Sequence, residues 1–302
     1  METAQSVRSW FEFLQLERPL RCLDVGALAL TGKPEPWVRW VMEGCAEVIG
    51  FEPLDQECAR LNQQAASEGL GGALRYLPWA LGDGEEHMLH VTNVPMTSSL
   101  YPPARATIDL FPALGELMRV EEQVPVRTRR LDDLEDARPA DFLKLDVQGA
   151  ERMVLEHTSE TLKDVAVLQS EVEFVELYEG QPLFADVDRL LRSQGFCFLR
   201  FAYTMGRPFR PLRQAANPNA ALSQLLWADA IYVRDFRQRQ QWSERQLKAA
   251  AFLLHELYGA FDLVALLLGE LDRRQGTQWQ ECYLGSVLLS RPDLALEIPA
   301  SA

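Results

Sequence analysis

The sequence predicts an α/β protein with a doubly wound, mostly parallel, seven-stranded sheet and a small α-helical appendage at its C-terminal end. Three observations predict this fold. Short apolar runs typical of buried strands alternate with amphipathic segments typical of helices. The first apolar run, residues 21–25, leads directly into Gly26, as in sheets that bind a ligand at a glycine turn. After Asp235 the composition shifts to helix-forming residues.

The length of 302 residues exceeds that of an ordinary single domain, so we expect one large domain with smaller additions. Hydrophobic residues make up 47% of the chain and charged residues 25%, as in folded globular proteins. We place an N-terminal helix in residues 1–19, the main domain in residues 20–238 and the helical appendage in residues 239–302.

Charge and cysteine content indicate which partners and which cellular compartment to expect. The formal net charge of −14 would repel a phosphate backbone, so we expect no nucleic-acid partner. The five cysteines include no C-x-x-C pair and the first residues lack a signal-peptide layout, so we expect a cytoplasmic protein. Charged residues interrupt the apolar segment 249–268, which argues against a membrane span.

The first part of the main domain reads as strand, helix, strand, helix, strand. We expect strands at residues 21–25, 47–51 and 74–81, with helices beginning near Pro36 and at Asp55. An additional strand is expected at residues 87–94, and order resumes at residues 124–129 after a proline-containing stretch.

The second part continues the alternation. Strands are expected at residues 142–146 and 165–172, and residues 196–201 and 228–233 are expected to pair as the last two strands. The segment 203–227 between them is long and contains glycines and prolines, which is typical of a functional loop. Ser243 and Gln246 have the spacing of a capping box, which predicts where the appendage helices begin.

In open α/β sheets the ligand lies outside the carboxyl ends of the strands, so the residues that end each strand carry the chemistry. Asp24, Gly26 and Ala27 follow the first strand, where a glycine lets the backbone approach a ligand closely. Glu52 and Pro53 end the second strand. A carboxylate there can accept both hydroxyls of a ribose, or it can cap the next helix.

Trp79 and Ala80 end the third strand, where an adenine ring could lie against them. Trp79 could equally belong to the core. His87 and His90 are three residues apart, which in a strand places them on opposite faces. We therefore predict that both histidines lie on the surface and that the chain has no metal site of this kind.

Lys144, Asp146 and Gln148 alternate along a strand and its exit, so they point to one side near the centre of the sheet. Glu171 and Glu173 repeat this pattern at the end of the next strand. Charged groups at the end of an apolar strand are costly unless they are paired or used. These carboxylates could provide a general base, hold a substrate cation or bind a divalent metal, or they could pair with Lys144 or with arginines.

Taken in order, these segments resemble the FkbM-type methyltransferases. The resemblance runs from about residue 20 to residue 235, and its most specific part is the lysine-aspartate-glycine-alanine-glutamate element. The segments that carry it are Leu-Asp-Val-Gly-Ala at 23–27, Gly-Phe-Glu-Pro at 50–53, Ala-Leu-Gly-Asp at 80–83, Asp-Phe-Leu-Lys-Leu-Asp-Val-Gln-Gly-Ala-Glu at 141–151 and Leu-Leu-Arg-Ser-Gln-Gly-Phe at 190–196.

The resemblance implies a class I fold with S-adenosylmethionine along the carboxyl edge of the sheet. It also implies methyl transfer to a hydroxyl of a sugar or natural product. The cofactor residues that it implies are Asp24, Gly26 and Ala27 for the methionine part, Glu52 with Pro53 for the ribose, Trp79 and Ala80 for the adenine, and Asp146 near the transferred methyl group.

Two positions depart from the family pattern. Residues 28–30 lack a glycine that the family often has, for which Gly32 would be a displaced substitute. Gln148 stands where the family usually has an acid, which removes one candidate base or metal ligand. A divalent metal is therefore not predicted.

A sulfonium makes its methyl group a strong electrophile, so the protein must align the acceptor and remove its proton. We hypothesise Asp146 or Glu171 as the base, with Lys144 beside them in the catalytic group. A small molecule with a hydroxyl group is the expected acceptor, and the residues expected on its side are Thr97, Ser98, Tyr101, Glu173 and Arg207. Arg207, Arg210 and Arg213 could contact an anionic ligand group or lie in a solvated loop.

Two alternatives remain open at this point. A nicotinamide-dependent oxidoreductase would share the sheet and the ribose acid, but the G-x-G-x-x-G turn is missing after the first strand. A catalytically degenerate methyltransferase fold that binds a partner is favoured by the altered glycine turn and by Gln148. The apolar C-terminal helices could pack on the domain or form a homodimer, because periodicity does not separate core from interface.

Overall fold

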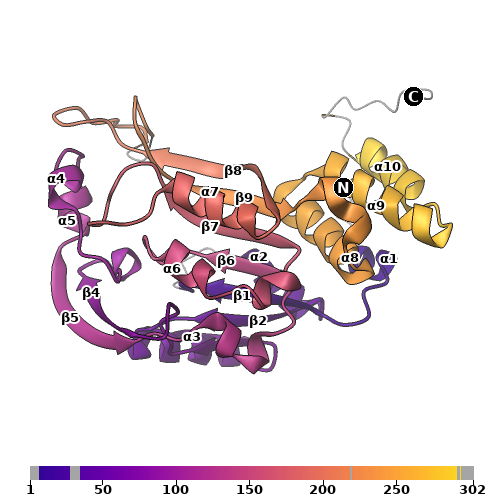
Figure 1. Ribbon diagram of the computed structural model, residues 1–302, viewed down its shortest axis with the longest axis horizontal. Coiled ribbons are helices and arrows are strands. Elements are labelled where there is room, and N and C mark those ends of the chain that lie inside the picture. Colours follow the sequence, from indigo (N-terminus) through magenta and orange to yellow (C-terminus); the bar gives the residue numbers. More distant parts are fainter. Residues whose placement is uncertain (1–6, 28–34, 218–219, 291–292, 294–302) are drawn as a thin grey trace.

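The computed structural model describes residues 7–27, 35–217, 220–290 and 293 (Figure 1). Its strands are β1 (Leu20–Val25), β2 (Ala46–Phe51), β3 (Leu74–Leu77), β4 (Glu86–Thr92), β5 (Val120–Arg127), β6 (Phe142–Leu145), β7 (Val167–Glu173), β8 (Phe196–Gly206) and β9 (Leu225–Arg234). Its α-helices are α1 (Val7–Phe13), α2 (Pro36–Met42), α3 (Asp55–Ser67), α4 (Arg105–Ile108), α5 (Leu114–Leu117), α6 (Glu151–Glu156), α7 (Phe184–Ser193), α8 (Glu244–Leu253), α9 (Phe261–Gln275) and α10 (Trp279–Ser290).

Seven strands form the main sheet in the order β3-β2-β1-β6-β7-β9-β8, which confirms the predicted doubly wound, mostly parallel sheet. β9 runs antiparallel to both of its neighbours. The strand order reverses between β1 and β6, and the crevice at such a switch point is where open α/β sheets bind ligands.

Several predicted boundaries were wrong. The third strand ends at Leu77 instead of residue 81, because Pro78 has no N–H to donate and the Trp79 N–H turns back to the Leu77 carbonyl oxygen at 2.8 Å. The last two strands are longer than predicted, so the loop between β8 and β9 spans residues 207–224 instead of 203–227.

The additional strand predicted near residues 87–94 is β4, which pairs with β5 in a separate antiparallel sheet. His90 on β4 is buried, not on the surface as predicted, and its Nδ1 lies 3.2 Å from Gln123 Nε2. Figure 1 shows this small sheet, with α4 and α5, at one end of the molecule. Side chains from β4 and from the segments that follow it line the site described below.

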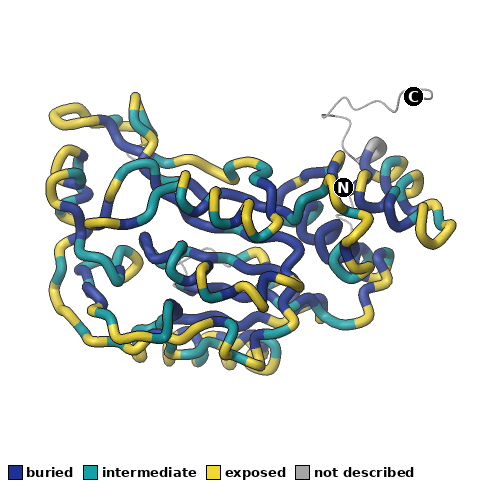
Figure 2. Tube along the Cα trace, in the orientation of Figure 1, coloured by how far each residue is buried: buried dark blue, intermediate teal, exposed yellow. Residues whose placement is uncertain are grey.

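The helices cover both faces of the main sheet. Residues of α6 and α7 pack in the core of one face, and residues of α1, α2, α3, α8 and α9 pack in the core of the other. The N-terminal helix therefore shares a core with the appendage, and the two lie together at one end of the molecule (Figure 1). Figure 2 shows the central strands and α8 as the most buried segments.

The C-terminal helices pack on the main domain. Every residue of α8 from Leu247 to Leu253 is buried, and the predicted capping box of Ser243 and Gln246 is present. Arg245, in the first turn, lies 2.7 Å from the buried Asp141 at the start of β6. None of the described helices combines the length and the apolar character that a membrane crossing requires.

The face that carries the appendage changes from apolar to polar along the strands. Near their amino-terminal ends the paired neighbours on β1, β6 and β7 are apolar, namely Cys22, Phe142 and Val167. Two residues further along they are Asp24, Lys144 and Gln169. Because side chains alternate with a period of two, the same face then presents Gly26, Asp146 and Glu171 beyond them. The polar groups thus gather at the carboxyl edge.

Candidate active site

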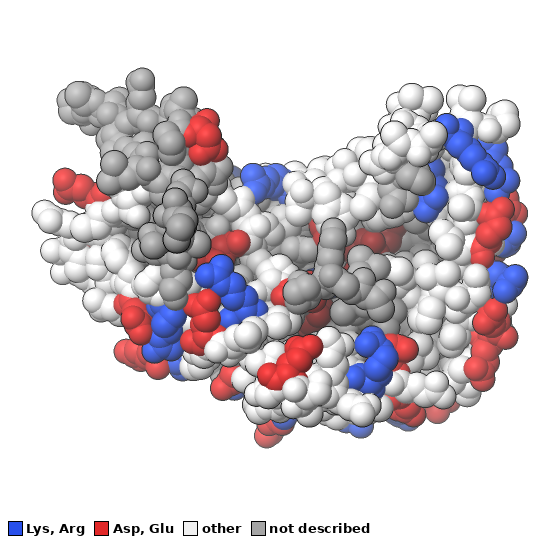
Figure 3. All heavy atoms as spheres, turned by 180° about the vertical axis from the view of Figure 1, so that it is seen from behind, with Lys and Arg blue, Asp and Glu red and all other residues white. Residues whose placement is uncertain are grey.

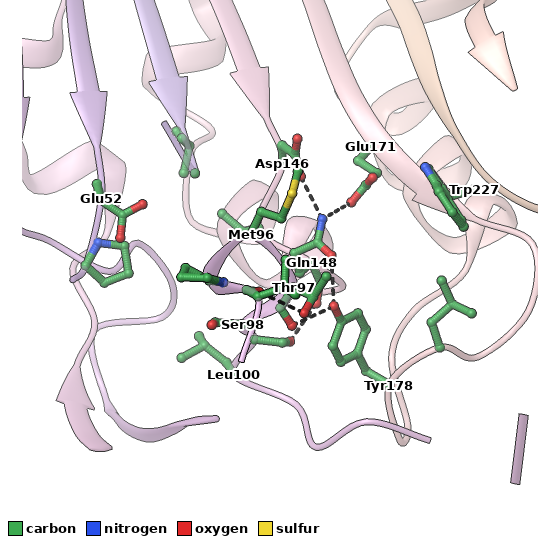
Figure 4. Close-up of a pocket in the computed structure, with 18 of the residues that line it drawn as sticks. Glu52, Met96, Thr97, Ser98, Leu100, Asp146, Gln148, Glu171, Tyr178 and Trp227 are labelled. Carbon is green, nitrogen blue, oxygen red and sulfur yellow. Dashed lines mark hydrogen bonds between the residues drawn. The ribbon is translucent and has the colours of Figure 1, made fainter. Parts of the chain in front are cut away.

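A cavity of about 700 Å³ lies at this carboxyl edge, under the segments that connect β4 and β5. Figure 3 shows acidic side chains in a hollow at the centre of one face. In Figure 4, Glu52 and Trp227 lie at opposite ends of the pocket, with Asp146 and Glu171 between them. The predicted site residues that line the cavity are Gly26, Glu52, Pro53, Trp79, Ala80, Thr97, Ser98, Lys144, Asp146, Glu171, Glu173 and Arg207.

Three predicted site residues do not line the cavity, namely Asp24, Ala27 and Tyr101. Asp24 and Ala27 are buried, and Asp24 Oδ1 lies 3.2 Å from Nζ of the lining residue Lys144. The Tyr101 N–H donates to Ser99 Oγ at 3.0 Å, in the turn that leaves the cavity wall. Residues 28–30 and Gly32, on which the altered cofactor turn was predicted, lie outside the described residues.

Gly26 forms the turn after β1 with a φ of +82°, a conformation that favours glycine. A Cβ atom on this residue would lie 1.8 Å from the backbone carbonyl oxygen of Asp146. The N–H groups of Gly26 and Ala27 both donate to the Phe51 carbonyl oxygen at 3.1 Å. The exits of β1, β2 and β6 are therefore held together in contact, and only glycine fits between them.

Lys144 holds the acids at the switch point. Its Nζ lies 3.2 Å from Asp24 Oδ1 and 3.9 Å from Asp146 Oδ2. Burial alone would lower the pKa of Lys144, but the carboxylates of Asp24 and Asp146 outweigh it and raise the pKa. The raised pKa favours the protonated form of Lys144, whose ammonium group lies between the carboxylates of Asp24 and Asp146.

Glu52 is buried at 4% exposure, and burial raises its pKa to about 7. Its Oε1 accepts a hydrogen bond from the Leu54 N–H at 2.8 Å. Among the described residues, no other group donates a hydrogen bond to this carboxyl group. A carboxylate has about four acceptor positions, so most of its capacity is unused. A neighbouring pair of ligand hydroxyls would fill that capacity.

Trp79 serves the core and the cavity at once. Trp79 stacks on Phe51 with 6.4 Å between the ring centroids. The Cζ atom of Arg129 lies 4.2 Å from the centroid of the Trp79 ring. It also lines the cavity beside Ala80. The two interpretations of this residue are therefore compatible, because Trp79 packs against Phe51 and also contributes to the cavity lining.

Gln148 joins the two candidate bases. Its Nε2 donates to Asp146 Oδ1 at 2.9 Å and to Glu171 Oε2 at 2.6 Å (Figure 4). The Tyr178 hydroxyl donates to Gln148 Oε1 at 2.8 Å, which fixes the orientation of the amide. Gln148 thus supplies two N–H donors between two carboxyl groups, where a third acid could supply none in its ionised form.

Glu171, Glu173 and Asp229 form a buried acidic cluster on β7 and β9. Burial, and then the neighbouring carboxylates, raise the pKa of Glu171 and Glu173 well above their ordinary value. Burial raises the pKa of Asp229, the cross-strand partner of Glu171, to about 6. No ion pair joins either glutamate to a lysine or arginine within the described ranges, so the predicted pairing with Lys144 or arginines is not how they are held.

Several lining residues were not predicted. Asp229 carried a usable signal, because it is a single carboxylate in the otherwise apolar run 228–233. Gln169 continues the alternation of Glu171 and Glu173. Glu35 and Tyr178 gave no local signal, since they reach the cavity only through tertiary folding, whereas Tyr203 begins the segment 203–227 that the sequence predicts to be functional.

Thr97 and Ser98 line the cavity, but their hydroxyl groups are engaged. Thr97 Oγ1 lies 2.7 Å from Thr92 Oγ1, and Ser98 Oγ accepts the Thr92 N–H at 3.1 Å. In the part of the chain that the structure describes, no three histidine, cysteine or acidic side chains are arranged to hold a metal ion.

The strand order, with its antiparallel seventh strand, and the polar carboxyl edge define the Rossmann-like fold of class I methyltransferases. The sequence model of the "Methyltransferase FkbM domain" family matches residues 24–198, more than half of the chain. The chain belongs to this family. Membership confirms the resemblance and S-adenosylmethionine as the cofactor.

Similar solved structures include an FkbM methyltransferase from Methylobacillus flagellatus, at 12% identity and a TM-score of 0.41. The match covers 71% of this chain, which spans only 43% of that protein. A Synechocystis magnesium protoporphyrin IX methyltransferase with bound S-adenosylmethionine matches at 13% identity and a TM-score of 0.36, covering 77% of this chain and 78% of that one. None of the curated proteins compared with the chain matches it. Similarities at this level carry no information on the substrate.

Proposed function

We propose that this chain transfers the methyl group of S-adenosylmethionine to a hydroxyl group of a small molecule, such as a sugar or natural product. One observation carries the proposal. Glu52, Asp146 and Glu171 line the same cavity, so an acid suited to a ribose and two acids suited to proton transfer face one space. Bound in that space, S-adenosylmethionine supplies an electrophilic methyl group.

The residues of the cavity fit this cofactor. Glu52, with its unused acceptor capacity, would receive the ribose hydroxyls, and Trp79 with Ala80 would border the adenine. The tight turn at Gly26 and Ala27, backed by Asp24, would hold the methionine part. The acidic lining also complements the positive charge of a sulfonium, since opposite charges in a partly buried site attract strongly.

We infer that Glu171 is the base that accepts the proton of the acceptor hydroxyl. Its buried carboxyl group has a raised pKa, so in its ionised form it binds a proton more readily than an exposed glutamate does. Gln148 holds Glu171 and Asp146 in fixed positions. Asp146, closer to Lys144, would face the transferred methyl group, and it is the alternative base.

The test of the base uses two amide variants. Glu171→Gln is expected to lower turnover about 100-fold or more, within the range of general-base catalysis, with the affinity for S-adenosylhomocysteine changed less than about threefold. Asp146→Asn separates the alternatives, because it removes the other candidate. Unchanged turnover in both variants removes both residues from the role.

The test of the function itself is calorimetric titration with S-adenosylhomocysteine. Transfer of labelled methyl from S-adenosylmethionine to a panel of hydroxylated small molecules accompanies it. Binding and labelling together support the proposal. Absence of S-adenosylhomocysteine binding overturns it.

A catalytically degenerate binding protein is the second candidate, and the replacement of the usual acid by Gln148 is the observation that favours it. It predicts S-adenosylhomocysteine binding without methyl transfer to any acceptor. The oxidoreductase alternative is set aside, because the chain belongs to a methyltransferase family.

A further inference from the structure

The end of the cavity away from Glu52 is mainly apolar and is built by three parts of the chain. Leu114 and Met118 come from the segment around α5, Met205 from the end of β8, and Trp227 from β9. Leu114, Met118 and Trp227 belong to one hydrophobic cluster, and Met205 is the cross-strand partner of Trp227. We call this end, with Arg207, the distal chamber.

Arg207 is the cation of the distal chamber. It lines the cavity although only 9% of its surface is exposed. Its Nη1 donates to the Pro112 carbonyl oxygen at 3.3 Å, a long bond, and its buried Nε–H has no hydrogen-bond partner among the described residues. The carboxylate whose charge acts on Arg207 is that of Glu116. This carboxylate pairs with Arg210, with 3.1 Å between Glu116 Oε1 and Arg210 Nη2.

An unpaired buried guanidinium is unfavourable. Taking an ion out of water costs several kcal/mol unless an opposite charge or good hydrogen bonds replace the water. Burial lowers the pKa of Arg207, but a guanidinium stays protonated in proteins. The missing partner is therefore an anion, and a carboxylate or phosphate matches the fork of N–H donors.

The charge of the remaining lining favours a single negative charge. Carboxylates such as Asp146 share the cavity and, when ionised, would repel a dianion more strongly than a monoanion. Leu114, Met118, Met205 and Trp227 supply apolar surface to this end of the cavity, and Glu173 is the cross-strand partner of Trp227. These surroundings suit a carboxylate on an apolar body, with the hydroxyl group to be methylated directed toward Glu171.

We propose that the acceptor is a hydroxylated carboxylic acid with an apolar body, whose carboxylate is bound by Arg207. This inference rests on the proposed function, since it names the acceptor class of the same site. It makes Arg207 a specificity-determining residue and leaves cofactor binding to the opposite end of the cavity.

The experiment titrates the protein, saturated with S-adenosylhomocysteine, with matched probes: benzoate and benzyl alcohol, hexanoate and 1-hexanol, and phenyl phosphate. We expect at least one carboxylate to bind about tenfold or more tightly than its alcohol, because a charge-assisted hydrogen bond is worth more than a neutral one. Arg207→Gln should abolish that preference, and Arg207→Lys should restore part of it. Arg210→Gln, which alters a neighbouring arginine paired with Glu116, should leave it intact.

The outcomes separate the two proposals. Failure of S-adenosylhomocysteine to bind overturns the proposed function. Cofactor binding with no preference for either carboxylate over its alcohol overturns the acceptor class alone. Phenyl phosphate binding more tightly than benzoate overturns the choice of a carboxylate. If Arg207→Gln does not fold, the comparison of each carboxylate with its alcohol on the unmodified chain still tests the acceptor class.

Discussion

Burial of the Glu52 carboxyl group raises its pKa from an ordinary 4.5 to about 7. Between these values the folded chain binds more protons than the unfolded chain, so stability falls as pH rises through this window. Glu52→Gln should therefore raise the free energy of unfolding of the cofactor-free protein at pH 8, by about 1–3 kcal/mol. It should have little effect at pH 4.5. Denaturant unfolding at both pH values measures this, and equal effects would contradict the account.

The same carboxyl group should make cofactor binding depend on pH. The ionised form accepts hydroxyl hydrogen bonds best, so affinity for S-adenosylhomocysteine should fall about tenfold from pH 8 to pH 6. Glu52→Gln should bind weakly and with a flat pH profile. Glu47→Gln is a matched control, because Glu47 lies on the same strand but its side chain is half exposed and pairs with Arg21. A pH dependence retained in Glu52→Gln would show that another group causes it.

Gln148 offers a test of the bridge between Asp146 and Glu171. Gln148→Glu removes both N–H donors and adds a third carboxyl group, so stability should drop at pH 8 by about 1–3 kcal/mol. The loss should be smaller at pH 5, where a protonated glutamic acid can again donate. Gln148→Met removes the donors without adding charge and should lose similar stability at both pH values. Thermal unfolding of the two variants at both pH values distinguishes them, and a pH-independent loss in Gln148→Glu would be incompatible with the bridge.

Among the elements, the turn after β1 depends most strictly on one residue. Gly26→Ala places a Cβ atom against the Asp146 carbonyl oxygen, so a loss of stability of about 4 kcal/mol or more is expected, together with loss of cofactor binding. Gly180→Ala is the matched control, because Gly180 has a similar φ of +72° but open space around it. That variant should lose only about 1–2 kcal/mol. Equal losses measured by denaturant unfolding would mean that φ alone, and not the contact with β6, requires glycine.

The appendage reaches the cavity wall through Tyr258. Its hydroxyl donates to Gln169 Oε1 at 2.8 Å, and the Gln169 amide donates to Asp229. Tyr258→Phe should cost about 1 kcal/mol of stability and weaken S-adenosylhomocysteine binding several-fold, because two lining side chains lose their support. Tyr283→Phe removes a hydroxyl that lies 3.0 Å from His255, away from the cavity lining, and should affect stability alone. Calorimetric titration measures the affinity of both variants for S-adenosylhomocysteine. Equal affinities in the two variants would exclude a positioning role for Tyr258.

The sequence predicts elements well where one local pattern decides them. The strands β1, β2, β6 and β7 follow from apolar runs with polar residues at or next to their carboxyl ends, namely Asp24, Glu52, Asp146 and Glu173. The joint cavity at the tips of those strands follows from the parallel topology. The sequence does not predict the other walls of the cavity, because residues such as Tyr178 reach the cavity from segments with no periodic signal.

At the scale of the whole molecule, the sequence leaves open what the C-terminal helices pack against, and the structure joins the two ends of the chain. Residues of α1 pack in the same core as α8, α9 and the sheet. No composition pattern reveals this, since an apolar helix face does not specify its partner.

The shared core makes a prediction about truncation. A chain ending at residue 238 would expose the apolar face of the sheet that α8 and α9 cover, so it should fail to fold cooperatively. A chain ending at residue 290 retains every described α-helix and should unfold as the full chain does. Circular dichroism with thermal unfolding compares them, and a cooperative transition in the shorter chain would contradict a shared core.

We propose that cofactor and acceptor share one cavity at the carboxyl edge of the sheet. A crystal structure of the chain with S-adenosylhomocysteine tests it most directly. We expect the ribose hydroxyls to lie on Glu52 and the sulfur atom to face Asp146 and Glu171, with the distal chamber left open. Density for the ligand at any other place, or a ribose that does not contact Glu52, would contradict it.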